Sequence, residues 1–287
     1  MVHWYKTLLS AFAEIKPTLI LSVPLIIEKI YRKQIQPMIA KPPMNWVLKV
    51  PYLNEVVLTQ IRQKLVGGFG GCFEEVIIGG AAMNAEVESF FRKIHFPFTI
   101  GYGMTETAPL ISYRHWSQFK PTSCGQILDN MEVRITDVNA EGVGEIEVRG
   151  DNVMIGYYKN EEATKATFTP DGWLRTGDLG YVDADGDIFI KGRSKTMLLG
   201  PNGQNIYPEE IEDKINNMPF VMESIVVQRE GKLVALVCPD MSACDAAGLA
   251  ADDLTAQMER MRKEVNRMLA NYEQISNVEI QPQEFEK

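Results

Sequence analysis

One short block of this sequence places a tyrosine, a threonine and a glutamate beside two glycines: Gly101-Tyr-Gly-Met-Thr-Glu-Thr107. Tyr102 can offer a ring face to a purine, and Thr105 can donate a hydrogen bond to a phosphate oxygen. Glu106 is a hard oxygen ligand of the kind that Mg²⁺ takes together with phosphates and water. These residue types suit nucleotide chemistry, and a turn capped by the same threonine and glutamate fits the block equally well.

A second group of polar residues follows farther along, in Thr176-Gly-Asp178 and Gly192-Arg-Ser-Lys195. Asp178 can accept two hydrogen bonds at once, which suits the vicinal diol of a ribose. The glycine beside it permits positive φ and close approach of a ligand, so we expect a turn at a strand end there. Arg193 and Lys195 add two cations to this group.

Three aspartates lie between these two motifs, in Asp183-Ala-Asp-Gly-Asp187. A calcium-binding EF-hand loop would need a glycine where Ile188 stands and a glutamate where Ser194 stands. The spacing therefore favours a plain hairpin turn between two strands.

Another glycine-rich turn, Gly79-Gly-Ala-Ala82, follows an apolar run at residues 73–78. Asn84 then caps an expected helix at residues 85–94. A strand that leads through glycines into a helix is how α/β proteins make ligand sites at the carboxyl ends of strands. A simple tight turn would use the same residues.

The order of these motifs resembles the adenylate-forming superfamily, which includes acyl-CoA synthetases, firefly luciferase and carrier-loading adenylation domains. Three blocks carry the resemblance: residues 101–107, Thr176-Gly-Asp178, and residues 192–195 followed by Asn202-Gly-Gln-Asn-Ile-Tyr-Pro-Glu-Glu-Ile-Glu212. The resemblance covers nearly the whole chain, and within the superfamily it is strongest to long-chain fatty-acid–CoA ligases.

The resemblance implies a role for each matching residue. The nucleotide-binding residues would be Gly80, Ala81, Tyr102, Gly103, Thr105, Asp178 and Arg193. Thr105 and Glu106 would be the catalytic residues, the first on phosphate and the second on magnesium. Lys195 would be the hinge, and Gly203, in a polar loop at residues 200–207, would line the coenzyme A channel.

The resemblance also implies a reaction in two steps, in which positioning and charge neutralisation do most of the work. A fatty acid would attack the α-phosphate of ATP to give an acyl-adenylate and pyrophosphate, with Mg²⁺ bound, and the thiol of coenzyme A would then take the acyl group. Two alternatives stay open. The first is activation of an acyl or aryl acid for loading onto a carrier protein, and the second is a non-catalytic nucleotide-binding module.

Two features of the family are missing. Its phosphate-binding loop, rich in Ser, Thr and Gly and ending in Pro-Lys-Gly, does not occur, and neither does the lysine expected after the final strand. We therefore expect a segment of a longer or engineered ligase that has no activity by itself. The orphaned apolar face and strand edge of such a segment would favour self-association.

The expected fold is an α/β large-domain fragment with a small β-barrel-like subdomain, followed by a small α+β lid. The first domain would be the C-terminal part of a large AMP-binding domain, residues 1–193, and the lid would be residues 194–287. Apolar runs and helical spacing place strands at 18–23, 73–78 and 96–100, a helix at 25–35, and loop with a short helix at 37–54. Alternating residues at 123–137 and 144–150 indicate the barrel-like strands, with a helix at 161–167 after Asn160. The lid would hold helices at 209–218 and 253–269, a hairpin at 222–238 and a strand at 275–280, with a stripe of Leu254, Met258, Met261, Val265 and Met268 in its core.

The composition sets limits on function. The chain has 287 residues, 45% of them hydrophobic and 23% charged, and a net charge of −9. These values indicate a globular protein and argue against nucleic-acid binding. We expect a cytoplasmic protein, because no apolar run reaches the ~20 residues of a membrane span and no signal peptide is apparent; peripheral membrane contact stays open. The four cysteines lack CxxC spacing and no Gly-x-Ser-x-Gly occurs, so free thiols are expected and a hydrolase elbow is not.

Overall fold

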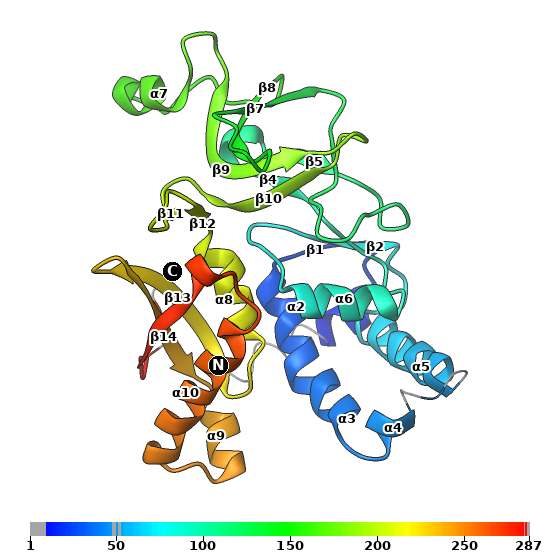
Figure 1. Ribbon diagram of the computed structural model, residues 1–287. Coiled ribbons are helices and arrows are strands. Elements are labelled where there is room, and N and C mark those ends of the chain that lie inside the picture. Colours follow the sequence, from blue (N-terminus) through cyan, green and yellow to red (C-terminus); the bar gives the residue numbers. More distant parts are fainter. Residues whose placement is uncertain (1–9, 48–49, 51–52, 284, 286–287) are drawn as a thin grey trace. The chain divides into compact units, whose positions relative to one another are not determined.

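The computed structural model describes residues 10–47, 50, 53–283 and 285, and Figure 1 draws their helices and strands. The contacts divide the chain into two compact units. The first unit consists of the described parts of Met1–Thr136, Glu147–Thr176 and Tyr181–Phe189, and the second of those of Asp137–Ile146, Gly177–Gly180 and Ile190–Lys287.

A parallel three-stranded sheet lies at the centre of the first unit. Its strands follow the order β1 (Leu19–Ser22), β2 (Glu75–Ile78) and β3 (Phe98–Ile100). Helices connect these strands and lie beside the sheet in Figure 1: α2 (Pro24–Ile30), α5 (Leu53–Gly68) and α6 (Ala85–Lys93). Parallel strands need such crossovers, so the predicted α/β class is confirmed.

The helix that begins with α2 extends farther than predicted. Pro24 occupies its first turn, where a missing N–H costs nothing. The helix passes through a π-helical turn at Tyr31–Ile35 into α3 (Gln36–Ala40), and α4 (Met44–Val47) follows. The π-helical turn lies just before Pro37, which has no backbone N–H to continue the α-helical pattern. Residues 48–49 and 51–52 of the predicted loop lie outside the described residues.

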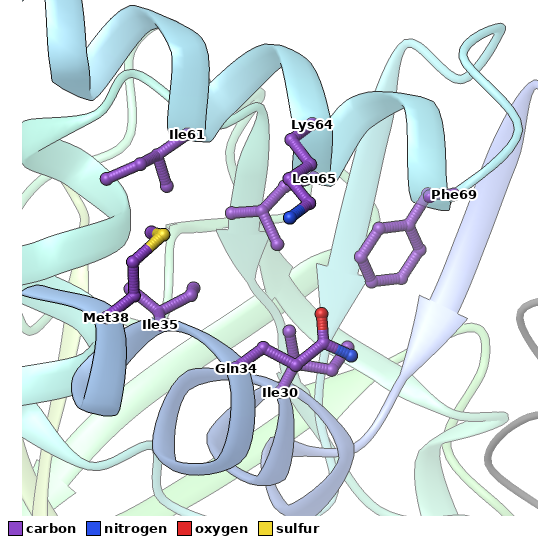
Figure 2. Close-up of a pocket in the computed structure, with 9 residues that line it drawn as sticks. Ile30, Gln34, Ile35, Met38, Ile61, Lys64, Leu65 and Phe69 are labelled. Carbon is purple, nitrogen blue, oxygen red and sulfur yellow. The ribbon is translucent and has the colours of Figure 1, made fainter.

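A small cavity of about 60 Å³ lies between this π-helical turn and α5. Figure 2 shows its mainly apolar lining, which includes Ile35, Met38 and Leu65, together with Gln34 and Lys64. We assign the cavity to imperfect packing around the irregular turn.

Aromatic side chains hold the helices of the first unit to its sheet. Neighbouring rings in this cluster have centroids 5.1–6.1 Å apart, mostly in tilted or edge-on arrangements. The cluster consists of Phe69, Phe73, Phe91, Phe96 and Phe98, all buried. Because two of these residues follow α5 and a third lies in α6, the cluster fixes both helices against β3.

Two further sheets follow in the chain. The smaller has the order β4 (Tyr102–Gly103), β5 (Leu110–Tyr113) and β6 (Gln126–Ile127). The larger has the order β10 (Ile188–Arg193), β9 (Leu174–Val182), β8 (Gly144–Gly150) and β7 (Met131–Thr136). The predicted barrel-like subdomain is not a closed barrel among the described residues, because the outer strands β10 and β7 do not pair with each other. Strand β10 is instead bonded at Ile188 to the segment that leads into β6, through the Cys124 N–H at 2.7 Å and the Gly125 carbonyl at 3.0 Å.

The turn between β9 and β10 confirms the predicted hairpin. The Asp183 N–H donates to the Asp187 carbonyl at 3.0 Å, and the Gly186 N–H donates to the Asp183 carbonyl at 3.1 Å. The Lys120 ammonium lies 2.6, 2.7 and 3.0 Å from carboxylate oxygens of Asp183, Asp185 and Asp187. These contacts raise the pKa of Lys120 and lower that of Asp183. A lysine of the chain therefore occupies the place at which three carboxylates converge.

The second unit is an α+β arrangement, as predicted for residues after 194. Its sheet has the order β13 (Val221–Arg229), β14 (Lys232–Pro239) and β15 (Ile275–Ile280), with an antiparallel hairpin and a parallel last strand. Its helices are α8 (Pro208–Asn216), α9 (Met241–Ala247) and α10 (Ala251–Asn266), with a 3₁₀ turn at Asn271–Glu273. Helix α9 was not predicted. The role of this unit as a lid, and the domain boundary between residues 193 and 194, stay predictions.

The predicted apolar stripe of α10 forms part of the core of the second unit. Leu254, Met258, Met261 and Val265 are buried there. Met268 is 51% exposed, contrary to the prediction, because it lies beyond the end of α10 at Asn266. In the described part of the chain, no helix is long and apolar enough to cross a membrane.

A partly buried carboxylate joins α8 to β13. Glu212 accepts a hydrogen bond from the Val226 N–H at 2.7 Å. Burial raises the pKa of Glu212 to about 7, and the nearby charge of Glu209 adds to the effect, whereas the hydrogen bond from Val226 opposes it. The second unit therefore contains a carboxyl group that is protonated more readily than usual.

Candidate functional site

Two glycine-containing segments leave the same edge of the parallel sheet. The first, residues 79–83, follows β2 and is named here the glycine loop; the second, residues 101–107, follows β3. The Gly101 N–H donates to the Ile78 carbonyl at 2.9 Å, and a Cβ added to Gly79 would lie 3.3 Å from the Gly101 carbonyl oxygen. The structure therefore brings together the two segments that the sequence singled out, at the carboxyl edge where α/β proteins bind ligands.

The glycine loop is open at its middle and anchored at its end. Gly80 has φ of +87°, which disfavours any residue with a Cβ, and Gly80 and Ala81 are exposed. Asn84 confirms the predicted cap, because its Oδ1 accepts from the Val87 N–H at 3.1 Å where α6 begins. The exposed backbone of the glycine loop therefore offers a surface that a flat ligand, such as a purine base, can approach.

Tyr102 is less exposed than a residue that stacks on a purine needs to be. It lies in β4, pairs with Ser112 of β5, and is only 7% exposed. The ring is therefore largely covered in this structure, and a purine would reach its face only after neighbouring groups move. Thr105, by contrast, is exposed in the 3₁₀ turn at Thr105–Thr107.

Gly103 has a structural requirement of its own. A Cβ added there would lie 1.8 Å from the Pro109 carbonyl oxygen, because β4 and β5 approach closely. No side chain fits at that distance. The residue is therefore fixed by backbone packing, whatever it contributes to a nucleotide.

We expect Gly103→Ala to lower the free energy of unfolding by about 3 kcal/mol or more, since the overlap involves backbone that cannot swing away. Gly71→Ala is the matched control: its φ is +76° and nothing lies within 4 Å of the added Cβ. That variant should lose only about 1 kcal/mol, from backbone strain. Urea denaturation of both variants measures the difference, and equal losses would contradict the steric assignment.

Glu106 is held by a segment farther along the chain. Its Oε1 accepts from the Tyr157 hydroxyl at 2.8 Å, and its carbonyl accepts from the Met154 N–H at 2.8 Å. Asn152 donates to the carbonyls of Thr107 and Leu110, at 2.6 and 2.8 Å. The hydrogen bond to the Glu106 carboxylate, with some burial, raises the pKa of Tyr157. Sequence reasoning did not single out Asn152 or Tyr157.

The described residues contain no group of three or more His, Cys, Asp and Glu side chains that could hold a metal ion. A divalent ion at Glu106 would therefore have fewer than three protein ligands of these types among the described residues. That fits Mg²⁺ bound largely by phosphates and water, which needs only one or two carboxylates, and it does not fit an ion held by the protein alone.

A second cluster forms within the second unit, around Asp178. The Arg193 Nε lies 3.0 Å from Asp178 Oδ1; the aspartate side chain is 9% exposed and the arginine 66%. The Ser194 N–H donates to the Gly177 carbonyl at 2.9 Å, and its hydroxyl does so at 3.1 Å. Contrary to the prediction of a turn at a strand end, Asp178 lies inside the nine-residue strand β9. Gly177 has φ of +72°, so the irregular backbone lies within the strand.

The predicted hinge and channel residues also lie in the second unit. Lys195 is exposed and follows the end of β10. Residues 200–207 are not a plain loop, because they contain β12 (Asn205–Ile206), which pairs with β11 (Leu198–Leu199) as a hairpin. Gly203 is exposed at its turn with φ of +79°.

Comparison with known proteins assigns the chain to a family. The sequence profile described as AMP-binding enzyme matches residues 3–158, which is more than half of the chain. The chain belongs to the AMP-binding enzyme family. The matched residues include both segments at the carboxyl edge of the sheet and end one residue after Tyr157.

Curated members of the AMP-binding enzyme family are similar over most of the chain. The long-chain-fatty-acid–CoA ligase FadD15 of Mycobacterium bovis is 30% identical over 98% of this chain and 52% of its own length. The long-chain-fatty-acid–CoA ligase ACSBG2 of Gallus gallus is 29% identical over 88% of this chain and 36% of its own. The chain thus spans about half the length, or less, of these relatives.

Solved structures of the AMP-binding enzyme type share the fold. ATP-bound MatB from Rhodopseudomonas palustris is 25% identical, with a TM-score of 0.67 over 97% of this chain and 49% of that one. Both units of the present chain therefore lie within the region of similarity.

Proposed function

We propose that the protein is an ATP-dependent acid–thiol ligase of the cytoplasm that activates a fatty acid as its acyl-adenylate and transfers it to coenzyme A. The observation that carries the proposal is the pair of segments at the carboxyl edge of the sheet, with Thr105 and Glu106 in one and the open glycine loop in the other. Family membership and the similarity to long-chain-fatty-acid–CoA ligases support it.

Each candidate residue has a proposed role in this reaction. Gly80 and Ala81 would border the adenine, with Tyr102 and Gly103 close to it. Thr105 would donate to a phosphate oxygen, and Glu106 would hold Mg²⁺, which offsets the negative charge of the phosphates when it is bound. In the second unit, Asp178 would accept from the ribose hydroxyls, with Arg193 keeping the carboxylate oriented. Gly203 would lie along the path of coenzyme A.

The decisive experiment measures products on the full-length protein with a panel of acids. Fatty acid, ATP and coenzyme A should give AMP, pyrophosphate and acyl-CoA, with medium and long chains favoured. Acyl transfer to a carrier protein but not to coenzyme A would select the carrier-loading alternative. Nucleotide binding without pyrophosphate release in any reaction would overturn the ligase assignment and leave a binding module.

Lys195 has the position of a hinge in this proposal, and its exposed side chain carries no assigned chemistry. We expect Lys195→Pro to slow thioester formation by roughly tenfold more than acyl-adenylate formation, because a fixed φ blocks one of two orientations of the second unit. Single-turnover measurements separate the two steps. Lys195→Ala, which keeps φ free, should affect both steps little, and equal losses in the proline variant would argue against a hinge.

We further propose that the chain alone lacks ligase activity and self-associates. Among the described residues, strand β1 is one of the two outer strands of the parallel sheet, and Leu19 and Leu21 on it are 51% and 76% exposed. An unpaired edge with large apolar side chains favours association with another chain. ATP–pyrophosphate exchange with a fatty acid, measured together with the mass in solution, tests both parts. Exchange above background would refute the first part, and a monomer would refute the second.

A further inference from the structure

One stretch of the chain, residues 22–31, holds the glycine loop at both of its ends. At the start of the loop, the Gly79 N–H donates to the Ser22 carbonyl at 3.1 Å. At its end, the Asn84 N–H donates to Glu28 Oε1 at 3.0 Å. Residues 80–82, between these two hydrogen bonds, are exposed. The conformation of the open part is therefore set by how firmly its two ends are fixed.

The hydrogen bond at the end of the loop depends on a side chain. Asn84 is 6% exposed and already uses its own side chain to cap α6 at Val87. The Asn84 N–H lies just before α6 and donates to the carboxylate of Glu28, a residue of α2. A carboxylate acceptor makes this a charge-assisted hydrogen bond, and the N-terminal end of α6 favours the negative charge.

A second polar contact joins the same helical segment to α6 but does not include the loop. The Tyr31 hydroxyl donates to Glu86 Oε1 at 2.9 Å. Tyr31 is 4% exposed, and burial, followed by this contact, raises its pKa. Glu86 lies inside α6, two residues beyond the cap. Loss of this contact would weaken the packing of α6 without releasing the end of the loop.

We propose that Glu28 is a positioning residue that fixes the glycine loop for nucleotide binding, a role that rests on the proposed function of that loop. Gly80 has no Cβ to restrict its backbone, so the loop depends on its anchors for a defined shape. A loop held in its binding shape loses less conformational entropy when a ligand arrives. Glu28 acts from outside the site, through the backbone of Asn84, and need not touch the nucleotide.

Three variants test this role: Glu28→Ala, which removes the acceptor; Glu28→Gln, which keeps an acceptor oxygen; and Tyr31→Phe, which removes only the second contact. Hydrogen exchange of the amides of residues 80–84 is measured on the chain itself, and AMP affinity is measured on the full-length protein. We expect Glu28→Ala to raise the exchange rate of these amides and the dissociation constant for AMP by roughly tenfold or more each. Glu28→Gln should return the exchange rate and the dissociation constant most of the way to the parental values. Tyr31→Phe should lower the melting temperature while leaving the exchange rate and the dissociation constant near the parental values.

The outcomes separate this inference from the proposed function. Unchanged loop exchange in Glu28→Ala would overturn the positioning role, as would a rise shared equally by all amides of the first unit, which would indicate general destabilisation. Faster loop exchange with unchanged AMP affinity would overturn the link to nucleotide binding. If the parental full-length protein binds no AMP, the proposed function fails, while the exchange data still decide whether Glu28 holds the loop.

Discussion

Glu106→Gln should reduce acyl-adenylate formation by the full-length protein by roughly 10²-fold or more, equivalent to about 3 kcal/mol of transition-state stabilisation. Glutamine keeps the size of the side chain and can still accept from the Tyr157 hydroxyl, so the turn at Thr105–Thr107 should keep its shape. What the substitution removes is the negative charge that a phosphate-bound Mg²⁺ would contact. Pyrophosphate release in the presence of a fatty acid and ATP measures the effect.

Two comparisons make the Glu106 result specific. Glu132→Gln removes a carboxylate of the same unit, an exposed residue of β7 that pairs with Arg149 at 2.7 Å, and it should leave pyrophosphate release unchanged. Tyr157→Phe keeps the charge of Glu106 but removes its hydrogen bond, and it should cause a smaller loss. Pyrophosphate release at the parental rate in Glu106→Gln would remove this residue from the reaction.

Glu212→Gln should remove a pH-dependent loss in the free energy of unfolding of up to about 3 kcal/mol. The folded-state pKa of Glu212 is about 7, above the ordinary value of a glutamate, so the folded protein favours the neutral carboxyl group. The stability that this group contributes is present below its unfolded-state pKa and is lost as the pH rises through about 7. Glutamine is neutral at every pH and can still accept from the Val226 N–H.

Urea denaturation at about pH 5 and about pH 8 checks this expectation. The free energy of unfolding of the parental protein should fall from about pH 5 to about pH 8. In Glu212→Gln the fall should be smaller, by up to about 3 kcal/mol. Glu264→Gln, an exposed position on α10, should follow the parent. If the pH dependence of Glu212→Gln equals that of the parent, the carboxyl group of Glu212 is not the source.

The features predicted well from the sequence are those with a local cause. Asn84 and Asn160 cap their helices as expected, because a cap depends on a side chain and amides three residues ahead. The turn at Asp183 was recognisable since its residues bond to one another. The boundaries of the last strand, Ile275–Ile280, also agree with the prediction.

The features that the sequence did not predict depend on distant partners. Tyr157 reaches Glu106 across 51 positions, and no periodicity marks such a pair. Helix α5 carries valines and a glycine pair that weaken its intrinsic preference, and it buries Leu58, Ile61 and Leu65 in the core. Helix α9 had a signal that could have found it: Asp240 accepts from the Ala243 N–H ahead of an alanine-rich run.

The lysine among the three aspartates of the β9–β10 turn makes that turn independent of dissolved cations. The cation that faces the three carboxylates is the ammonium group of Lys120. Because it belongs to the polypeptide, every molecule carries one, and no chelator can remove it. Stripping divalent ions from the protein, or titrating them back, should therefore leave this acidic turn unaltered. Any structural change that follows magnesium addition can then be attributed to another part of the molecule, and the hairpin serves as an internal reference for such a titration.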